Sequence, residues 1–256
     1  DAAGNVYATG LTDGGIFTQA WAGAYNDATF GGGFQDGFIL RFTNTGALTW
    51  ATYYGGSGFE GFNTYDNIDI DACGNVYFGF ETYSVNIPIF GSAGVAPCLQ
   101  YYDPGFNGGS FYGDIFLIKF SNTGAASWAV YFGGDGDDFR ACLAVDNTGN
   151  LFVAGEWTQA GGSLTSATYP VINPGGAYYD ATFNAGTDDS YIAKFEPVVP
   201  TITPSQTACT ACDGTATVTP GSACSIAPYV YTWNNGQTTS TATGLCTGTY
   251  TVTVAA

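Results

Sequence analysis

The sequence contains no histidine, no methionine and only 4 lysine and arginine residues among its 256 positions. Histidine is the side chain that most often acts as a general base or metal ligand near neutral pH, so its absence argues against much enzymatic chemistry. The 4 basic and 21 acidic residues give a formal net charge of −17. Phosphate binding needs clustered cations, so we expect no nucleic-acid partner and no binding to an anionic membrane surface.

Long apolar runs are also missing, and charged residues make up only 10% of the chain. No stretch of about 18 apolar residues is present, which predicts no membrane insertion. The chain is nevertheless rich in core-forming residues, because 45% are hydrophobic and 16% are aromatic. Disordered chains have few aromatics and much charge, so this composition predicts a folded protein. The length of 256 residues predicts one large all-β domain or two ordinary domains. Without an initiator methionine or a signal peptide, we expect a mature or internal fragment.

An internal repeat organises most of the chain. Three kinds of segment recur in constant order: DAAGNVYATG, DACGNVYFGF and DNTGNLFVAG from Asp1, Asp71 and Asp146; DGFILRF, DIFLIKF and DSYIAKF from Asp36, Asp114 and Asp189; NTGALTWATYYGG and NTGAASWAVYFGG from Asn44 and Asn122. The first segment recurs after 70 and then 75 residues, and the second after 78 and then 75. The repeat therefore defines a structural unit of about 75 residues.

Each repeat has the pattern of short β-strands separated by tight turns. The D-x-x-G-N and N-T-G segments favour turns, because Asp and Asn bond to nearby backbone and Gly accepts positive φ. Aromatic and β-branched residues in short alternating runs favour strands. We predict strands near 4–9, 37–43, 47–54, 63–70, 75–80, 114–120, 125–132, 139–145, 150–155 and 189–195. Four antiparallel strands per repeat are typical of a propeller blade.

The D-x-x-G-N-V-Y-x-x-G, D-x-F-x-x-K-F and W-x-x-Y-x-G-G segments resemble the SBBP beta-propeller repeat of bacterial surface proteins. The resemblance covers about residues 1–196 and implies blade-like four-stranded antiparallel repeats, so we expect a propeller-type domain over 1–195. Ten strands make about two and a half blades, fewer than the four to eight of a closed propeller. We therefore expect an incomplete propeller, one completed by assembly with other copies, or an open array. The long connections at 81–113 and 156–188 depart from the family pattern and are expected to add strands or cap the blades.

The composition changes after the last repeat. Residues 196–206 contain three prolines and are predicted to form an extended linker. Residues 207–256 are rich in Thr, with strands expected at 214–219, 229–233, 239–244 and 248–254. The segments CDGTATVT, YVYTWNNGQTT and ATGLCTGTYTVTV resemble the SprB-type repeat of a gliding-motility adhesin. This resemblance implies a small immunoglobulin-like or fibronectin-like β-sandwich in a secreted Bacteroidetes surface protein. We expect a final strand of the sandwich to be missing, and hypothesise that a neighbouring subunit supplies it.

Four of the seven cysteines fall in the last module, which is small enough to gain from disulfides. Four cysteines allow three pairings. The fibronectin-like order implied by the resemblance places the loops of Cys212 and Cys246 at one end of the sandwich, and we predict that these two pair. A redox or zinc role for the Cys209-x-x-Cys212 pair is the alternative, although zinc needs four ligands. For Cys73, Cys98 and Cys142, a core thiol and a disulfide both remain open.

Acidic clusters are the only candidates for a cofactor site. Asp135, Asp137 and Asp138 follow a Gly-Gly pair and offer the oxygen ligands that Ca²⁺ prefers. The alternative is that they are solvated or turn-forming acids, because the twin stretch at 55–60 keeps only one acid. Paired carboxylates could also hydrolyse glycosides, but no nucleophile motif, phosphate loop or dinucleotide fingerprint is present. We therefore expect no enzyme.

Two further repeated positions concern binding and charge. A Y-x-D-x-x-F motif in the long connections places Asp27, Asp103 and Asp180 beside aromatic residues, which could stack on sugars or simply cap the blades. Arg41, Lys119 and Lys194 share one repeat position, and we expect each to pair with a carboxylate inside the sheet stack.

The leading hypothesis is an extracellular structural or adhesive protein of a bacterial surface, either a filament subunit or a segment of a large adhesin. Its expected partners are copies of itself or neighbouring surface domains. The alternative is a glycan-binding module.

Overall fold

The computed structural model describes residues 1–16, 18–61, 67–90, 103–107, 113–134, 136–147, 149–158, 188–195, 201–205, 212–219 and 230–255. All secondary-structure elements in these ranges are β-strands, so the predicted all-β class is confirmed. The chain divides into two compact units; the described residues up to Phe195 belong to the first, and those from Thr201 onward belong to the second. No helix in the described ranges is long and apolar enough to span a membrane.

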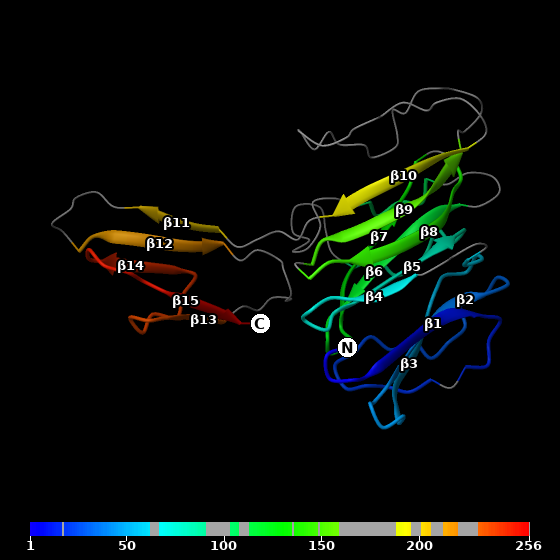
Figure 1. Ribbon diagram of the computed structural model, residues 1–256, viewed down its shortest axis with the longest axis horizontal. Helices are drawn as coiled ribbons and strands as arrows, with labels where there is room; N and C mark the ends of the chain where they lie inside the picture. Colours follow the sequence, from blue (N-terminus) through cyan, green and yellow to red (C-terminus); the bar gives the residue numbers. More distant parts are fainter. Residues whose placement is uncertain are drawn as a thin grey trace. The chain divides into compact units, whose positions relative to one another are not determined.

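The first unit contains three small antiparallel sheets in chain order (Figure 1). The first sheet has the order β1-β2-β3, the second β4-β5-β6-β7 and the third β10-β9-β8. Their strands are β1 (Val6–Thr12), β2 (Asp36–Phe42), β3 (Leu48–Tyr54), β4 (Ile68–Ile70), β5 (Val76–Thr82), β6 (Asp114–Phe120), β7 (Ala126–Phe132), β8 (Asp138–Val145), β9 (Leu151–Thr158) and β10 (Asp188–Phe195). Each predicted strand of this unit is found, and the expected strand at 63–70 is described only over Ile68–Ile70.

The sequence repeat is also a repeat of strand register. Phe38 pairs with Tyr53 between β2 and β3, and Phe116 pairs with Tyr131 at the same place between β6 and β7. Both strand pairs carry a register shift at the residue before the final Phe. The N-T-G turn that joins each pair places its glycine at positive φ, 83° at Gly46. Equivalent residues therefore occupy equivalent places in successive sheets.

The second sheet is buried on both faces. Every residue of β5 and β6 is buried. On one face, Phe120 packs edge-on against Trp50 of the first sheet, with ring centroids 5.1 Å apart. On the other face, a Cβ at Gly79 of β5 would lie 3.3 Å from Leu143 of β8, so glycine allows the third sheet to approach closely. The sheets thus stack face to face, as propeller blades do, while closure into a propeller stays a prediction.

The long connections run along the outer edges of two sheets. Gln19 forms a β-bridge with Ala51 of β3, and Phe90 forms one with the equivalent Ala129 of β7. Further along, the backbone N–H groups of Tyr53 and Tyr131 donate to the carbonyls of Asp27 and Asp103. These bonds occupy main-chain groups that an edge strand would otherwise expose to other chains. The described parts of the connections at 13–35 and 81–113 therefore extend the sheet edges, whereas residues 159–187 of the connection at 156–188 lie outside the described residues.

The second unit is a pair of small antiparallel sheets around its own core. One sheet has the order β11-β12-β14 and the other pairs β13 with β15. The strands are β11 (Thr201–Ser205), β12 (Gly214–Thr219), β13 (Val230–Trp233), β14 (Thr241–Leu245) and β15 (Val252–Ala255). Val218, Trp233 and Leu245 form the centre of the core. The immunoglobulin-like assignment of this unit stays a prediction.

The structure differs from the sequence prediction at the proposed linker. Residues 201–205 lie inside the expected Pro-rich linker at 196–206, yet they form β11 and pair with β12. Pro204 lies opposite Ala216 in this pair. Proline is tolerated at the edge of a sheet, where its missing N–H removes no ladder bond. This part of the linker therefore belongs to the second unit.

Candidate functional site

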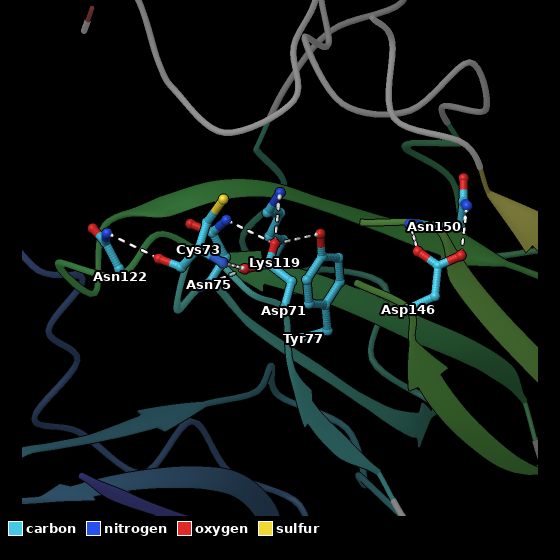
Figure 2. A network of polar contacts seen from close by, with 8 residues as sticks. All are labelled: Asp71, Cys73, Asn75, Tyr77, Lys119, Asn122, Asp146 and Asn150. Atoms are coloured by element: carbon cyan, nitrogen blue, oxygen red, sulfur yellow. Dashed lines mark hydrogen bonds and ion pairs between the residues drawn. The ribbon is translucent and has the colours of Figure 1, made fainter. Parts of the chain in front are cut away.

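A cluster of polar contacts surrounds Asp71, at the turn before β5 (Figure 2). Its Oδ1 accepts hydrogen bonds from the backbone N–H groups of Cys73 and Asn75, at 3.0 and 2.9 Å. Its Oδ2 accepts from the Asn75 side-chain amide at 2.8 Å and from the Tyr77 hydroxyl at 3.2 Å. The carboxylate is thereby committed to the backbone and side chains of its own turn.

The same bonds recur in the other D-x-x-G-N segments. Asp1 accepts from the backbone N–H and the side-chain amide of Asn5. Asp146 accepts from the same two groups of Asn150, as Figure 2 also shows. Because the Asn follows the Asp by four positions, one carboxylate accepts hydrogen bonds from both its backbone N–H and its side-chain amide, and so stabilises the turn. The motif is therefore a turn-stabilising device that the sequence repeat copies from sheet to sheet.

The basic residues at the shared repeat position differ in their partners. Lys119 Nζ lies 3.9 Å from Asp71 Oδ2 and 4.9 Å from the centre of the Tyr77 ring. The predicted carboxylate partner is thus confirmed for Lys119. Arg41 instead donates to the hydroxyls of Tyr7 and Thr49, which corrects the prediction at this position. Its guanidinium also lies over the Trp21 ring at 4.5 Å, so aromatic and hydroxyl groups take the place of a carboxylate.

Two carboxyl groups meet between the first and second sheets. Asp36 opens β2 and is 1% exposed, while Glu60, in the turn after β3, is 0% exposed. Asp36 Oδ2 accepts a hydrogen bond from the Gly31 N–H. Glu60 Oε1 accepts from the hydroxyls of Thr82, at 3.0 Å, and of Ser84. The other two oxygens, Asp36 Oδ1 and Glu60 Oε2, are buried without a hydrogen-bond partner among the described atoms.

Burial sets the protonation of this pair. The pKa of Glu60 is raised from 4.5 to about 7, chiefly by burial and also by the neighbouring Asp36, while the hydroxyl of Ser84 opposes the rise. Burial also raises the pKa of Asp36, against the lowering effect of the Gly31 N–H. A buried carboxyl favours its neutral form because the charge loses its hydration.

The second and third sheets repeat this arrangement, with Asp114 on β6 and Asp138 on β8. Asp114 opens β6 and Asp138 follows the Gly133-Gly134 pair, as Glu60 follows Gly55-Gly56. Asp114 Oδ2 accepts from the Asn107 N–H at 2.7 Å, in the role that Gly31 has for Asp36. Asp114 and Asp138 are 0% and 1% exposed. This pairing was not predicted from the sequence, although Glu60 and Asp138 lie at equal offsets from their Gly-Gly pairs.

The predicted calcium ligands are only partly described. Asp135 lies outside the described residues, while Asp137 and Asp138 are buried rather than solvated. Asp138 donates its backbone N–H to the Gly113 carbonyl at 2.8 Å. No group of three or more Asp, Glu or Cys residues in the described ranges is placed to hold a metal ion. Calcium binding by Asp135, Asp137 and Asp138 stays a prediction.

The Y-x-D-x-x-F carboxylates bond within their own segments where they are described. Asp27 Oδ1 accepts from the backbone N–H and the hydroxyl of Thr29. Asp103 Oδ1 accepts from the Gly105 N–H, and its Oδ2 accepts from the Asn107 side chain. Asp180 lies outside the described residues. These bonds give Asp27 and Asp103 a local turn-forming role, and glycan binding by the three residues stays a prediction.

The aromatic residues of these motifs pack on the neighbouring sheets. Phe30 contacts Tyr53, with ring centroids 6.3 Å apart, and Phe106 contacts Tyr131 at 6.1 Å. Tyr25 lies 5.0 Å from Tyr54. The described motifs therefore attach the connections to the sheets through both their backbone and their rings.

The disulfide predicted between Cys212 and Cys246 is present, with Cα atoms 4.0 Å apart. It joins the residues before β12 to the turn after β14, where the Cys246 N–H donates to the Tyr250 hydroxyl at 3.0 Å. Cys73 and Cys142 are exposed thiols, so neither is a core thiol. Cys98, Cys209 and Cys224 lie outside the described residues.

Comparison with known proteins adds no family assignment. No family model matches the chain, and no curated protein matches it. The resemblances to SBBP and SprB repeats therefore stay predictions. The geometry defines an all-β protein of stacked, repeated antiparallel sheets followed by a disulfide-linked β-unit.

Proposed function

We propose that the chain is a non-enzymatic structural or adhesive part of a bacterial cell surface, built from SBBP-type repeats and a SprB-type module. The observation that carries the proposal is that the repeated polar motifs form hydrogen bonds within the fold. The carboxylates of Asp1, Asp71 and Asp146 each close a turn of their own repeat. Repetition of such turns extends a rigid stack of sheets, which is what a scaffold or an adhesin stalk needs.

Two further observations support the proposal. The disulfide between Cys212 and Cys246 is compatible with an oxidising environment outside the cytoplasm. The long connections occupy main-chain groups at the edges of β3 and β7, which limits uncontrolled strand pairing. The expected partners are copies of the chain or neighbouring domains of a surface protein.

Electron microscopy tests this proposal. Immunogold labelling of the producing cells is expected to place the protein on their surface, and label confined to the cytoplasm would contradict the proposal. Negative-stain images of the purified chain then distinguish the two versions of the proposal. Regular filaments indicate a filament subunit, and discrete particles indicate a segment of a larger adhesin.

A glycan array tests the alternative function. The lectin hypothesis predicts binding that is lost in Asp27→Ala and Asp103→Ala but retained in Asp13→Ala, which removes an exposed carboxylate elsewhere. Such a result would replace the scaffold proposal by glycan binding. Because both target carboxylates bond to nearby backbone, the circular dichroism of each variant must match that of the parent protein.

A further inference from the structure

Asp36 and Glu60 pose a problem of charge, because two buried carboxyl groups lie together without a basic partner. All 4 lysine and arginine residues of the chain are described. The ion pairs formed among the described residues are Lys119 with Asp71 and Arg140 with Glu156. Two buried carboxylates without a counter-charge are strongly unfavourable, so the pair needs a proton or another cation.

The geometry around Gly55 favours the proton. A Cβ at Gly55 would lie 2.8 Å from Asp36 Oδ1 and 2.9 Å from Glu60 Oε2, so both unpartnered oxygens adjoin one small space. The other oxygen of each carboxyl already accepts hydrogen bonds from protein donors. One proton between the two unpartnered oxygens satisfies both atoms and removes one charge. Calcium takes six to eight oxygen ligands, and only two unpartnered oxygens lie here.

We propose that Asp36 and Glu60 bind one shared proton at neutral pH, and that the hydrogen bond made by this proton links the first sheet to the second. Asp36 belongs to β2 of the first sheet, whereas Glu60 forms a β-bridge with Thr82 at the end of β5. The side chain of Glu60 also accepts hydroxyl hydrogen bonds from Thr82 and Ser84. The shared proton therefore joins two sheets.

A neighbouring carboxylate also favours the protonated form of the pair. Asp27, in the connection beside β3, adds negative potential at Asp36. Tyr131 of β7 interacts electrostatically with Glu60 and is neutral near pH 7, because burial raises its pKa to about 12. The folded protein holds the proton of Glu60 up to about pH 7, whereas the unfolded chain releases it near pH 4.5. The stabilising contribution is complete below the unfolded pKa and is lost as pH rises through the folded one.

Thermal melting between pH 5 and pH 8 tests the proposal. In Glu60→Gln, an amide N–H replaces the shared proton and can donate to Asp36 Oδ1 at every pH. We expect this variant to melt on the order of 5 °C above the parent protein at pH 8, with little difference at pH 5. Glu156→Gln is the matched control, since it removes one carboxylate from an exposed ion pair. This control should keep the pH slope of the parent protein.

Two results would overturn the proposal. The first is an equal loss of stability with pH in the parent protein and in Glu60→Gln. The second is a rise in the melting temperature of the parent protein with CaCl₂ at pH 8 that Glu60→Gln abolishes, which would assign the space to a cation. If Glu60→Gln does not fold, infrared spectroscopy of the parent protein decides. A buried carboxylic-acid C=O band at pH 6 that disappears on raising the pH supports the shared proton, and its absence refutes it.

Discussion

Lys119 Nζ lies 3.9 Å from Asp71 Oδ2, and the two side chains are only 2% and 3% exposed. The pair lies on the second sheet, where Asp71 also closes the turn before β5 and Lys119 contacts the Tyr77 ring. Removal of water from both charges is costly, so each depends on the other for compensation. The ion pair is therefore coupled to the turn and to the core of the second sheet.

This coupling predicts that Asp71→Ala destabilises the first unit by about 3–5 kcal/mol, because it leaves a buried lysine without its carboxylate. Asp1→Ala removes the equivalent turn residue of the first sheet, where Arg41 bonds to Tyr7 and Thr49 instead. Its cost should be nearer the roughly 1 kcal/mol of a lost neutral cap or hydrogen bond. Urea denaturation measures both values, and equal costs would contradict a role for the ion pair.

The Cys212–Cys246 disulfide closes a loop with a sequence separation of 34 residues. Loop-closure entropy predicts that Cys212→Ser with Cys246→Ser destabilises the second unit by roughly 3–4 kcal/mol. Hydrogen exchange should show lost protection in β12 and β14 while β5 and β6 keep theirs. An equal loss in both units would show that the disulfide does not act locally.

The space at Gly55 predicts the effect of a single methyl group. Gly55→Ala places a Cβ within 2.9 Å of both Asp36 Oδ1 and Glu60 Oε2, and we expect a loss of about 1–3 kcal/mol. At Gly248 the nearest side-chain atom, in Tyr250, would be 3.9 Å away, so Gly248→Ala should change stability by less than about 0.5 kcal/mol. Thermal denaturation compares the two, and a neutral Gly55→Ala would show that the carboxyl pair tolerates separation.

Calcium binding near Asp135, Asp137 and Asp138 makes a separate prediction. Chelation with EGTA should lower the melting temperature of the parent protein, and added CaCl₂ should restore it, because a ligand that binds only the folded state stabilises it. The response should vanish in Asp137→Asn with Asp138→Asn. A melting temperature that chelation leaves unchanged would contradict calcium binding at these residues.

Local sequence patterns were sufficient to predict most of the strands and turns. The D-x-x-G-N and N-T-G segments act over three to five residues, so their turns follow from short-range hydrogen bonds and from glycine at positive φ. Repetition then placed Lys119 and Arg41 at equivalent positions. Their different partners did not follow from the pattern, because Trp21 reaches Arg41 from a long connection whose path the repeat does not specify.

The amino-acid sequence by itself determined the all-β class, the period of the repeat and the turn chemistry, because these depend on neighbouring residues. The paired disposition of Asp36 and Glu60 depended on tertiary structure, since they are 24 positions apart and meet only where the turn after β3 joins β5. The same holds for β11, because the three prolines of residues 196–206 suggest a linker, and only the pairing with β12 shows that residues 201–205 form a strand. Long-range packing decides which polar groups lose water, and that loss gives the carboxyl pair its chemistry.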